Sequence, residues 1–425
     1  MVLCHLVNND LIATPVGLYN LGNTCYLNST LQCLVHCVPL QDAFLSKLVH
    51  PYQCCSTLKG GKSSCLACEM DKLFLEHYGS CIGIDAIAAL EEEKGTSGAL
   101  LNEPVPEHCG HPIIPSNFLK EVWTNSTVRH LARHDQHDAQ EFYHALIDGL
   151  ETDVLSYQKK LRSMNQEIKS ETQVRRGYQP PDMSSESSIK DIFEGSLRSV
   201  LICDECGCKR SQNEPFLNLS LPLKNEFPSL SDASVAKEKV TTRSETSTLA
   251  ACLNHFTEPE TLQDHIYCPS CNRKTKTLKQ HTFGKLPRIL CLHLKRFDAL
   301  TNKKISDFVS YPATNLDMGQ YLPHWCEKIL SVDKNDNGTM QTQTQTDVES
   351  PKVLYDLYAT VNHRGSLHQG HYTSNIKCND HWYHCNDAFV CNAGEGNGEK
   401  EVLEAEGTRG GDAYMLFYRR KEKTK

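Results

Sequence analysis

The sequence of 425 residues contains no hydrophobic run that approaches 18 residues, the length a helix needs to cross a bilayer. It has no excess of positive charge, since 44 lysine and arginine residues face 52 aspartate and glutamate residues, for a net charge of −8. The first residues, MVLCHLVNNDLIA, offer neither a basic start nor a small-residue cleavage site. These absences argue against a membrane-spanning protein, a secretory signal and a protein whose main partner is nucleic acid.

Cysteine, in contrast, is abundant, with 21 residues in the chain. A disulfide scaffold is normally short and secreted, and this chain is long and has no signal for secretion. The cysteine count is odd and several cysteines form C-x-x-C pairs, which indicates metal sites in a reducing compartment. We therefore expect an intracellular protein. With 39% hydrophobic residues, the chain has enough apolar side chains for a sizeable core.

The apolar pattern changes its period along the chain. Leu27, Leu31 and Leu34 recur at helical spacing, which predicts a helix with a buried face beginning at Cys25. Helical patterns return up to residue 162, and alternating patterns typical of strands dominate after residue 195. Helices followed by strands predict an α+β fold. The segments predicted to lie outside it are a tail over 1–14 and mobile polar inserts over about 163–188, 225–248 and 331–351.

Cys25 lies at the predicted start of a helix, after a turn that contains Gly22. The unpaired N–H groups and the dipole at a helix N-terminus favour an anion, so a thiolate is stabilised there. The same N–H groups, helped by the side-chain amide of Asn20, could donate to a developing oxyanion. The alternative is that Cys25 is one buried thiol among many.

A cysteine nucleophile needs a base that is held by a third group. His371 follows Gly370 at the start of a predicted strand, where glycine permits close approach of a substrate backbone. Asn386 and Asp387 follow after one further strand, and a hairpin would place either of them beside His371 to fix its tautomer. Each histidine alone is equally consistent with a structural role.

Two groups of cysteines have the spacing of zinc ligands. Cys203-x-x-Cys206 and Cys268-x-x-Cys271 supply the four thiolates of a tetrahedral structural site, with Cys208 and Cys252 as weaker substitutes. A second group consists of His50, Cys54, Cys65 and Cys68, where Cys55 could replace Cys54 and buried cysteines are the alternative. We expect one or two zinc ions. Neither site leaves an open position for water, so both ions would be structural.

Five segments occur in an order that resembles the ubiquitin-specific proteases. They are the Cys25 segment, QHDAQEF at 136–142, LPRILCLHLKRF, GHYTSNIK and the closing AYMLFYRR. The resemblance covers roughly residues 15–420 and implies a papain-like cysteine protease fold with a helical thumb, a β-rich palm and zinc-bearing fingers. The implied catalytic domain spans 15–421, with the thumb at about 15–160, the fingers at about 195–285 and the palm at about 286–420.

The resemblance also assigns roles to individual residues. Cys25 would be the nucleophile, His371 the general base and Asn386 the third member of the triad, with Asp387 sharing its work. Asn20 matches the oxyanion-stabilising position. Gln136, Asp138 and Glu141 match the cleft that holds the arginine-bearing tail of ubiquitin, although the two carboxylates could also be ordinary solvated helix charges.

The implied function is a deubiquitinating thiol isopeptidase, an enzyme that cleaves after the C-terminal glycine of ubiquitin on protein lysines. CLACEMDKLFLEHYG, CLNHFTEPETL and YATVNHRGSLHQGHYTS are most similar to the catalytic subunit of the SAGA deubiquitinating module. This similarity suggests histone H2B or its A-type counterpart as a substrate. It also suggests module subunits as partners. The nucleus is the expected location, with the cytoplasm as the alternative. About 15 residues precede the cysteine segment, so we expect the N-terminal zinc finger of such relatives to be missing.

Two other functions compete with this one. The first is an inactive ubiquitin-binding scaffold of the same fold, which would not need complete segments around Cys25 and His371. The second is a zinc-finger protein that binds nucleic acid, which the charge of −8 disfavours.

Overall fold

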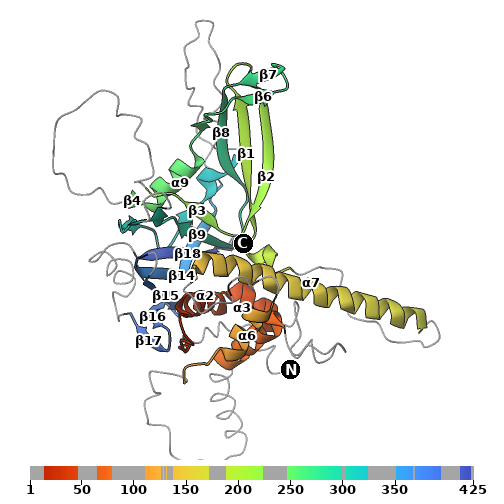
Figure 1. The fold of residues 1–425 in the computed structure, drawn as a ribbon, viewed down its shortest axis with the longest axis vertical. Helices are drawn as coiled ribbons and strands as arrows, with labels where there is room; N and C mark the ends of the chain where they lie inside the picture. Colours follow the sequence, from red (N-terminus) through yellow and green to blue (C-terminus); the bar gives the residue numbers. More distant parts are fainter. Residues whose placement is uncertain are drawn as a thin grey trace, which may run out of the picture. The chain divides into compact units, whose positions relative to one another are not determined.

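A computed structural model describes the greater part of the chain (Figure 1). The described residues are 14–45, 65–78, 111–125, 128, 131, 137–171, 188–223, 247–298, 303–323, 351–366, 369–393 and 412–422. They divide into two compact units, which are considered one at a time below. The first comprises Met1–Ile192 with Ala359–Gly398, and the second comprises Phe193–Tyr358 with Glu399–Lys425. None of the helices in these described ranges is long and apolar enough to cross a membrane.

The first unit begins with the helix that the sequence predicts at Cys25. Helix α2 (Cys25–Val35) is buried along its entire length, and Leu27, Leu31 and Leu34 are fully inaccessible to solvent. The predicted buried face is therefore confirmed. The other helices of this part are α3 (Val38–Leu45), a helix over 66–78, α6 (Ser116–Thr124), α7 (Ala139–Glu171) and, at the unit boundary, α8 (Lys190–Phe193).

Helix α7 begins where its first N–H groups find an acceptor. Asp138 Oδ1 accepts hydrogen bonds from the backbone nitrogens of Gln140 at 2.8 Å and Glu141 at 3.0 Å. Asp138 is thus the N-cap of the helix. The helix continues to Glu171, whereas the sequence predicts an exposed insert from 163. The polar composition that suggested an insert is compatible with helix, because Lys, Arg, Gln and Glu are good helix formers.

Among its described residues, the first unit also contains four antiparallel strands. The C-terminal half of β14 (Leu354–Gly365) pairs with β15 (Gly370–Cys378), β15 pairs with β16 (His381–Asn386), and β16 pairs with β17 (Phe389–Asn392). Helix α2 packs against β15, so segments far apart in the sequence meet at one core. Ile376 and Trp382 are almost fully buried in these strands.

The second unit is built around two groups of strands. A four-stranded antiparallel sheet has the order β2-β1-β8-β5, and the long strands β1, β2 and β8 run side by side in Figure 1. The hairpin of β6 and β7 lies near one end of these strands. In the other group, β9 is antiparallel to β18 and parallel to β3, and all of its residues are buried.

The bounds of the elements of the second unit are as follows: β1 Gly195–Cys203, β2 Lys209–Phe216, β3 Leu219–Leu221, β4 Ser247–Thr248, α9 Leu249–Thr257, β5 Glu260–Thr261, β6 Ile266–Cys268, β7 Arg273–Thr275, β8 Thr277–Lys285, β9 Ile289–Leu294, β10 Phe297–Asp298, β11 Lys303–Lys304, β12 Val309–Ser310, β13 Leu316–Asp317, the 3-10 helix η3 Gly319–Tyr321 and β18 Ala413–Arg420. Helices therefore dominate the N-terminal part and strands the rest, which confirms the predicted α+β class. The predicted inserts over 225–248 and 331–351 lie almost wholly outside the described residues.

Candidate active site and metal centre

Cys25 is the first residue of α2, as predicted, and is 2% exposed. The turn before it contains two consecutive left-handed residues, Gly22 with φ of 103° and Asn23 with φ of 54°. The side chain of Asn20 closes this turn, because its Oδ1 accepts from the backbone nitrogens of Gly22 at 2.9 Å and Thr24 at 3.3 Å. The turn thus places the thiol at the positive end of the helix dipole.

His371 is the second residue of β15, and its ring lies against the end of β16. Nε2 of His371 is 2.8 Å from Oδ1 of Asn386. A carbonyl oxygen can only accept, so Nε2 carries the proton in this arrangement and Nδ1 keeps a lone pair. The hairpin therefore brings together His371 and Asn386 as the sequence predicts, in the tautomer that a general base needs.

Asp387 occupies the turn between β16 and β17 and has a positive φ of 50°. Its Oδ2 lies 4.0 Å from Nε2 of His371, too far for a hydrogen bond. Each carboxylate oxygen instead accepts from an asparagine: Oδ2 from Nδ2 of Asn20 at 2.9 Å, and Oδ1 from Nδ2 of Asn28 at 2.7 Å. Asp387 lies beside His371, and its hydrogen bonds go to the segments around Cys25.

Sequence reasoning did not identify Asn28 as part of this site. The residue lies on α2, three positions after Cys25, and is 2% exposed. One sequence signal could have revealed it: Asn28 is a polar residue one helical turn after the predicted nucleophile, within a helix whose apolar pattern indicates burial. A buried amide needs hydrogen-bond partners, and those partners lie in distant segments.

Asp138 and Glu141, predicted to bind substrate, lie at the start of α7. Asp138 also has a structural task as the helix cap, and Glu141 is exposed in the first turn. Burial raises the pKa of Tyr372 well above its ordinary value, and the carboxylate of Asp138 raises it further, which places Asp138 close to the strand of His371. Burial, with smaller effects from Cys25 and Glu141, raises the pKa of Tyr26 to about 12. Gln136 lies outside the described residues.

Gly370 was predicted to make room for a substrate backbone, but the structure gives its lack of a side chain an internal reason. A Cβ atom at this position would lie 2.0 Å from Nε2 of His363. His363 is 3% exposed and belongs to the neighbouring strand β14. The absence of a side chain at Gly370 therefore lets β14 and β15 pack closely beside His371.

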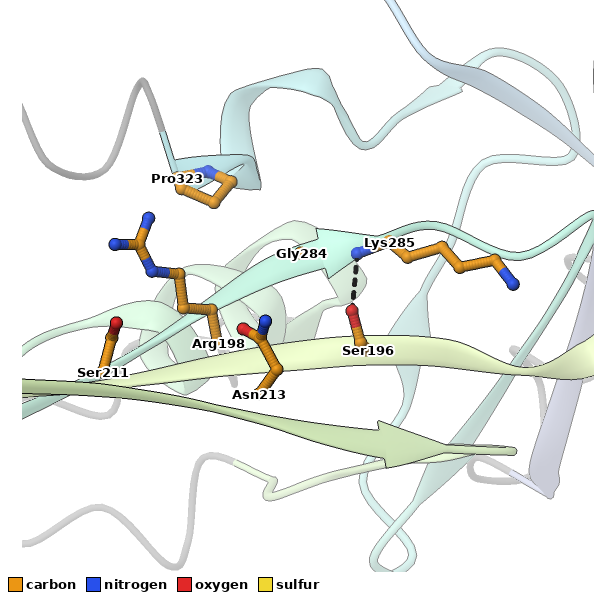
Figure 2. A pocket seen from close by; sticks show the side chains of 7 residues that line it. All are labelled: Ser196, Arg198, Ser211, Asn213, Gly284, Lys285 and Pro323. Carbon is orange, nitrogen blue, oxygen red and sulfur yellow. Dashed lines mark hydrogen bonds between the residues drawn. The ribbon is translucent and has the colours of Figure 1, made fainter.

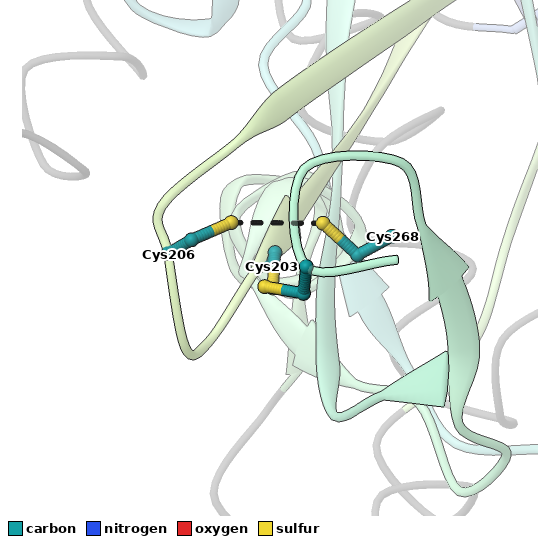
Figure 3. A group of neighbouring side chains, drawn as sticks. Cys203, Cys206 and Cys268 are labelled. Atoms are coloured by element: carbon teal, nitrogen blue, oxygen red, sulfur yellow. Dashed lines mark hydrogen bonds between the residues drawn. The ribbon is translucent and has the colours of Figure 1, made fainter. Parts of the chain in front are cut away.

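The four cysteines predicted to bind zinc in the second unit come together, and Figure 3 shows three of them with their sulfurs turned toward one another. The four Sγ atoms lie within 4.8 Å of one another. Two of the separations are 3.8 Å, between Cys203 and Cys271, and 3.6 Å, between Cys206 and Cys268. Four sulfurs at 2.3 Å from a tetrahedral zinc ion are about 3.8 Å apart. These two separations therefore match those around a tetrahedral zinc ion.

Of the second predicted zinc group, Cys65 and Cys68 are described, whereas His50 and Cys54 lie outside the described residues. The backbone nitrogen of Cys68 is 3.4 Å from Sγ of Cys65, at the start of the helix over 66–78. The two cysteines thus lie one helical turn apart at a helix N-terminus.

A pocket of about 540 Å³ lies on the four-stranded sheet of the second unit (Figure 2). Its lining is polar and consists of Ser196, Arg198, Ser211, Asn213, Gly284, Lys285 and Pro323. None of these described lining residues is a histidine, a cysteine or an acidic residue, so none of them is a base that could activate a hydroxyl. The candidate catalytic residues all lie in the first unit, and this pocket is a separate feature.

Residues 16–418 match the family model described as ubiquitin carboxyl-terminal hydrolase. The chain therefore belongs to the ubiquitin carboxyl-terminal hydrolase family, whose members are cysteine-type deubiquitinases.

Similar proteins include ubiquitin carboxyl-terminal hydrolase 22 of Homo sapiens, which is 33% identical over 414 residues, and ubiquitin carboxyl-terminal hydrolase 27 of Homo sapiens, which is 32% identical over 411 residues. Both alignments cover 95% of this chain, which spans 65% of the first relative and 78% of the second. A solved structure of the SAGA Ubp8/Sgf11/Sus1/Sgf73 DUB module bound to ubiquitin aldehyde has a similar fold, with a TM-score of 0.62 and 24% identity. That match covers 97% of this chain and 71% of the other. The ubiquitin-specific protease fold predicted from sequence is confirmed.

Proposed function

We propose that this protein is a deubiquitinating thiol isopeptidase, with Cys25 as nucleophile and His371 as general base. The observation that carries the proposal is the 2.8 Å contact from Nε2 of His371 to Asn386, within the same unit as a cysteine at a helix N-terminus. Cysteine nucleophiles of this kind require a base whose tautomer is fixed by a third residue. Family membership supports the same chemistry.

The reaction follows from these positions. His371 takes the proton of the Cys25 thiol, and the resulting thiolate attacks the carbonyl carbon of the C-terminal glycine of ubiquitin, which is joined to a lysine ε-amine. The oxyanion that forms accepts hydrogen bonds from backbone N–H groups at the start of α2 and from the amide of Asn20. His371 then protonates the departing amine, which leaves a thioester on Cys25. A water molecule, deprotonated by His371, attacks the thioester and releases the ubiquitin carboxylate and the free thiol.

The predicted substrate-binding residues fit this scheme in part. The tail of ubiquitin carries arginines, and the carboxylates of Asp138 and Glu141 at the start of α7 are suited to bind them. Gln136 precedes them in the same segment. Gly370 leaves the first position of the His371 strand without a side chain, which permits close approach of the substrate backbone.

We assign zinc to the four-cysteine cluster, where it would be bound by Cys203, Cys206, Cys268 and Cys271. The ion would supply structural cross-links and no reacting group, because four protein ligands fill its coordination sphere. A second zinc ion at Cys65 and Cys68, with His50 and Cys54, is the corresponding proposal for the first unit.

The names of the similar proteins also suggest where this protein acts. The solved structure is of a SAGA DUB module that contains Sgf11, Sus1 and Sgf73. We propose by analogy that this protein works with module subunits of that type in the nucleus, with ubiquitinated histone H2B or its A-type counterpart among its substrates. A failure of the chain with such partners to release ubiquitin from nucleosomes would contradict the histone assignment.

The competing function is a ubiquitin-binding scaffold without catalysis. A ubiquitin derivative with a C-terminal electrophile distinguishes the two, because only an activated thiol becomes joined to it. We expect a covalent adduct with the wild-type chain and none with Cys25→Ala, with Cys33→Ala as the control for a buried cysteine of the same helix. Binding of ubiquitin without an adduct, also when module subunits are added, would favour the scaffold.

A further inference from the structure

The pocket on the four-stranded sheet of the second unit is rich in hydrogen-bond donors. It lies against β1, β2 and the end of β8, with Pro323 across from the sheet (Figure 2). Its volume of about 540 Å³ is in the range of pockets that bind small ligands. The proposed isopeptidase chemistry, which belongs to the first unit, makes no use of this pocket.

The register of the strands places the polar side chains of the pocket on one face of the sheet. Arg198 on β1 is directly opposite Asn213 on β2, and residues directly opposite each other share a face. Ser196 and Ser211 lie two positions along the same strands, so they belong to that face as well. Figure 2 shows these four side chains rising to the same side, toward Pro323. The pocket thus gathers a guanidinium, an amide and two hydroxyls.

These groups can donate more hydrogen bonds than they use within the sheet. A guanidinium carries five N–H donors, so Arg198 can bind a ligand and keep its contacts within the chain. The hydroxyl oxygen of Ser196 accepts from the backbone nitrogen of Lys285 at 2.9 Å, which leaves its own O–H to donate. The amide nitrogen of Asn213 carries two further N–H donors. Such a set suits an anion with several oxygen atoms.

None of the described lining residues of the pocket is acidic. Glu214 follows Asn213 on β2, but it is opposite Leu197 and therefore lies on the other face of the sheet. Burial lowers the pKa of His281, and the carboxylate of Glu214 opposes this shift, which places the two side chains near each other. His281 is opposite Ser199, on that same other face. The neighbouring carboxylate therefore faces away from the pocket.

Gly284 on β8 keeps space open between two of the donors. A Cβ atom at this position would lie 2.7 Å from Oγ of Ser196 and 3.8 Å from Oδ1 of Asn213. A larger residue would therefore crowd the Ser196 hydroxyl and fill this part of the pocket. The absence of a side chain leaves room for a ligand oxygen beside the two groups.

We propose that this pocket binds a phosphate group, with the guanidinium of Arg198 as its main ligand. The planar fork of arginine matches phosphate with two parallel hydrogen bonds. A phosphate monoester has three terminal oxygens, one more than a carboxylate, and so can also accept from the hydroxyls and the amide. Its source is a phosphorylated serine of another protein or a free phosphate compound, which share this chemistry. The proposal does not depend on the isopeptidase function.

The test is isothermal titration calorimetry of the full chain at constant ionic strength, because screening by salt alters any binding between charges. The probes are inorganic phosphate and a short peptide with phosphoserine between glycines. The same peptide with serine, and with glutamate, in place of phosphoserine serves for comparison. We expect heat of binding with phosphate or the phosphoserine peptide and none with the serine peptide. The glutamate peptide should bind at least about tenfold more weakly than the phosphoserine peptide.

Two variants change the pocket and a third is the matched control. Arg198→Ala should weaken binding at least about tenfold, as for the loss of hydrogen bonds between charged groups. Asn213→Asp keeps the shape of the side chain but places a carboxylate beside the phosphate, and should weaken binding to a similar extent. Arg210→Ala removes one positive charge from the other face, because exposed Arg210 on β2 is opposite Leu201, and should change binding by less than about twofold. A wild-type Tm shows that each variant is folded.

The proposal is overturned if neither phosphate nor the phosphoserine peptide binds, if Arg198→Ala and Asn213→Asp bind as the wild type does, or if Arg210→Ala loses as much affinity as they do. A glutamate peptide that binds as tightly as the phosphoserine peptide would also overturn it, in favour of a carboxylate site. Tighter binding of the phosphoserine peptide than of inorganic phosphate would identify a phosphorylated protein as the source. The reverse order would identify a free phosphate compound.

Discussion

Removal of zinc from the four-cysteine cluster is expected to open one end of the second unit while the rest of the fold persists. Besides the sulfurs, the segments around the cluster, 203–208 and 266–275, are joined by the contact of Cys203 with Thr275 and by an ion pair on the surface, in which Arg273 donates to Glu205. Strands β6 and β7 share three residue pairs, Tyr267 is 50% exposed and Cys206 is exposed. A hairpin of this size is marginally stable without further support.

The magnitude follows from the concentration of free zinc relative to its dissociation constant. Two Sγ separations, 3.6 and 3.8 Å, match those around a tetrahedral zinc ion, so the sulfurs are already gathered for binding. Without metal the sulfurs differ in their ionisation: the Thr275 hydroxyl helps to lower the pKa of Cys203 to about 6, whereas contact with the other cysteines raises the pKa of Cys271. With free zinc at about 1,000 times its dissociation constant, binding stabilises the closed form by about 4.1 kcal/mol. That is roughly a thousandfold in the opening equilibrium.

The assay is amide hydrogen exchange followed by mass spectrometry, with metal content measured on the same sample. A chelator, or Cys206→Ser, should accelerate exchange over 203–208 and 266–275 by up to about a thousandfold. Exchange in α2 and β15 should not change. Cys208→Ser is the matched control, because Cys208 lies outside the group of four and its loss should leave both zinc content and exchange as in the wild type. Unchanged exchange after chelation, or zinc retained in Cys206→Ser, would refute the assignment.

Three substitutions test other parts of the structure. Asp138→Ala removes the cap of α7 and should lower the free energy of unfolding by about 1 kcal/mol, measured by urea denaturation; an unchanged midpoint would show that the cap does not contribute. Gly370→Ala places a Cβ 2.0 Å from Nε2 of His363, so we expect a loss of thermal stability, and a wild-type Tm would mean that the two strands separate easily. Arg296 is fully buried and donates to the carbonyl oxygens of Ala413, Ile305 and Asp307; Arg296→Met should cost about 3–5 kcal/mol in a denaturant titration, and a loss below about 1 kcal/mol would contradict this.

Local patterns predicted the parts of the molecule that depend on neighbouring residues. The helix that begins at Cys25, the strand that contains His371 and the C-x-x-C pairs all follow from spacing within a few residues. The hairpin of β15 and β16 followed from the same kind of signal, and it was enough to place Asn386 beside His371. The extent of α7 was not predicted, because the polar residues after 162 are compatible with helix and with loop alike.

The contacts that sequence reasoning could not supply join distant segments. The hydrogen bond from Asn28 to Asp387 spans 359 positions, and the apolar pattern of α2 gives no indication of that partner. The close approach of His363 to Gly370 is another such contact, and the substrate-binding role of Gly370 stays a prediction. The dual position of Asp138, as helix cap and as neighbour of Tyr372, likewise depends on tertiary packing.

The central claim is that Cys25 and His371 form a working pair that cleaves ubiquitin from lysine. The most direct test is hydrolysis of ubiquitin joined by an isopeptide bond to a lysine peptide, followed by mass spectrometry with the wild-type chain, Cys25→Ala and His371→Ala, each alone and with module subunits. We predict free ubiquitin and free peptide from the wild type, with a thioester-linked ubiquitin on Cys25 trapped at early times. Neither variant should release product. Release by Cys25→Ala at the wild-type rate, or none by the wild type under any of these conditions, would contradict the account.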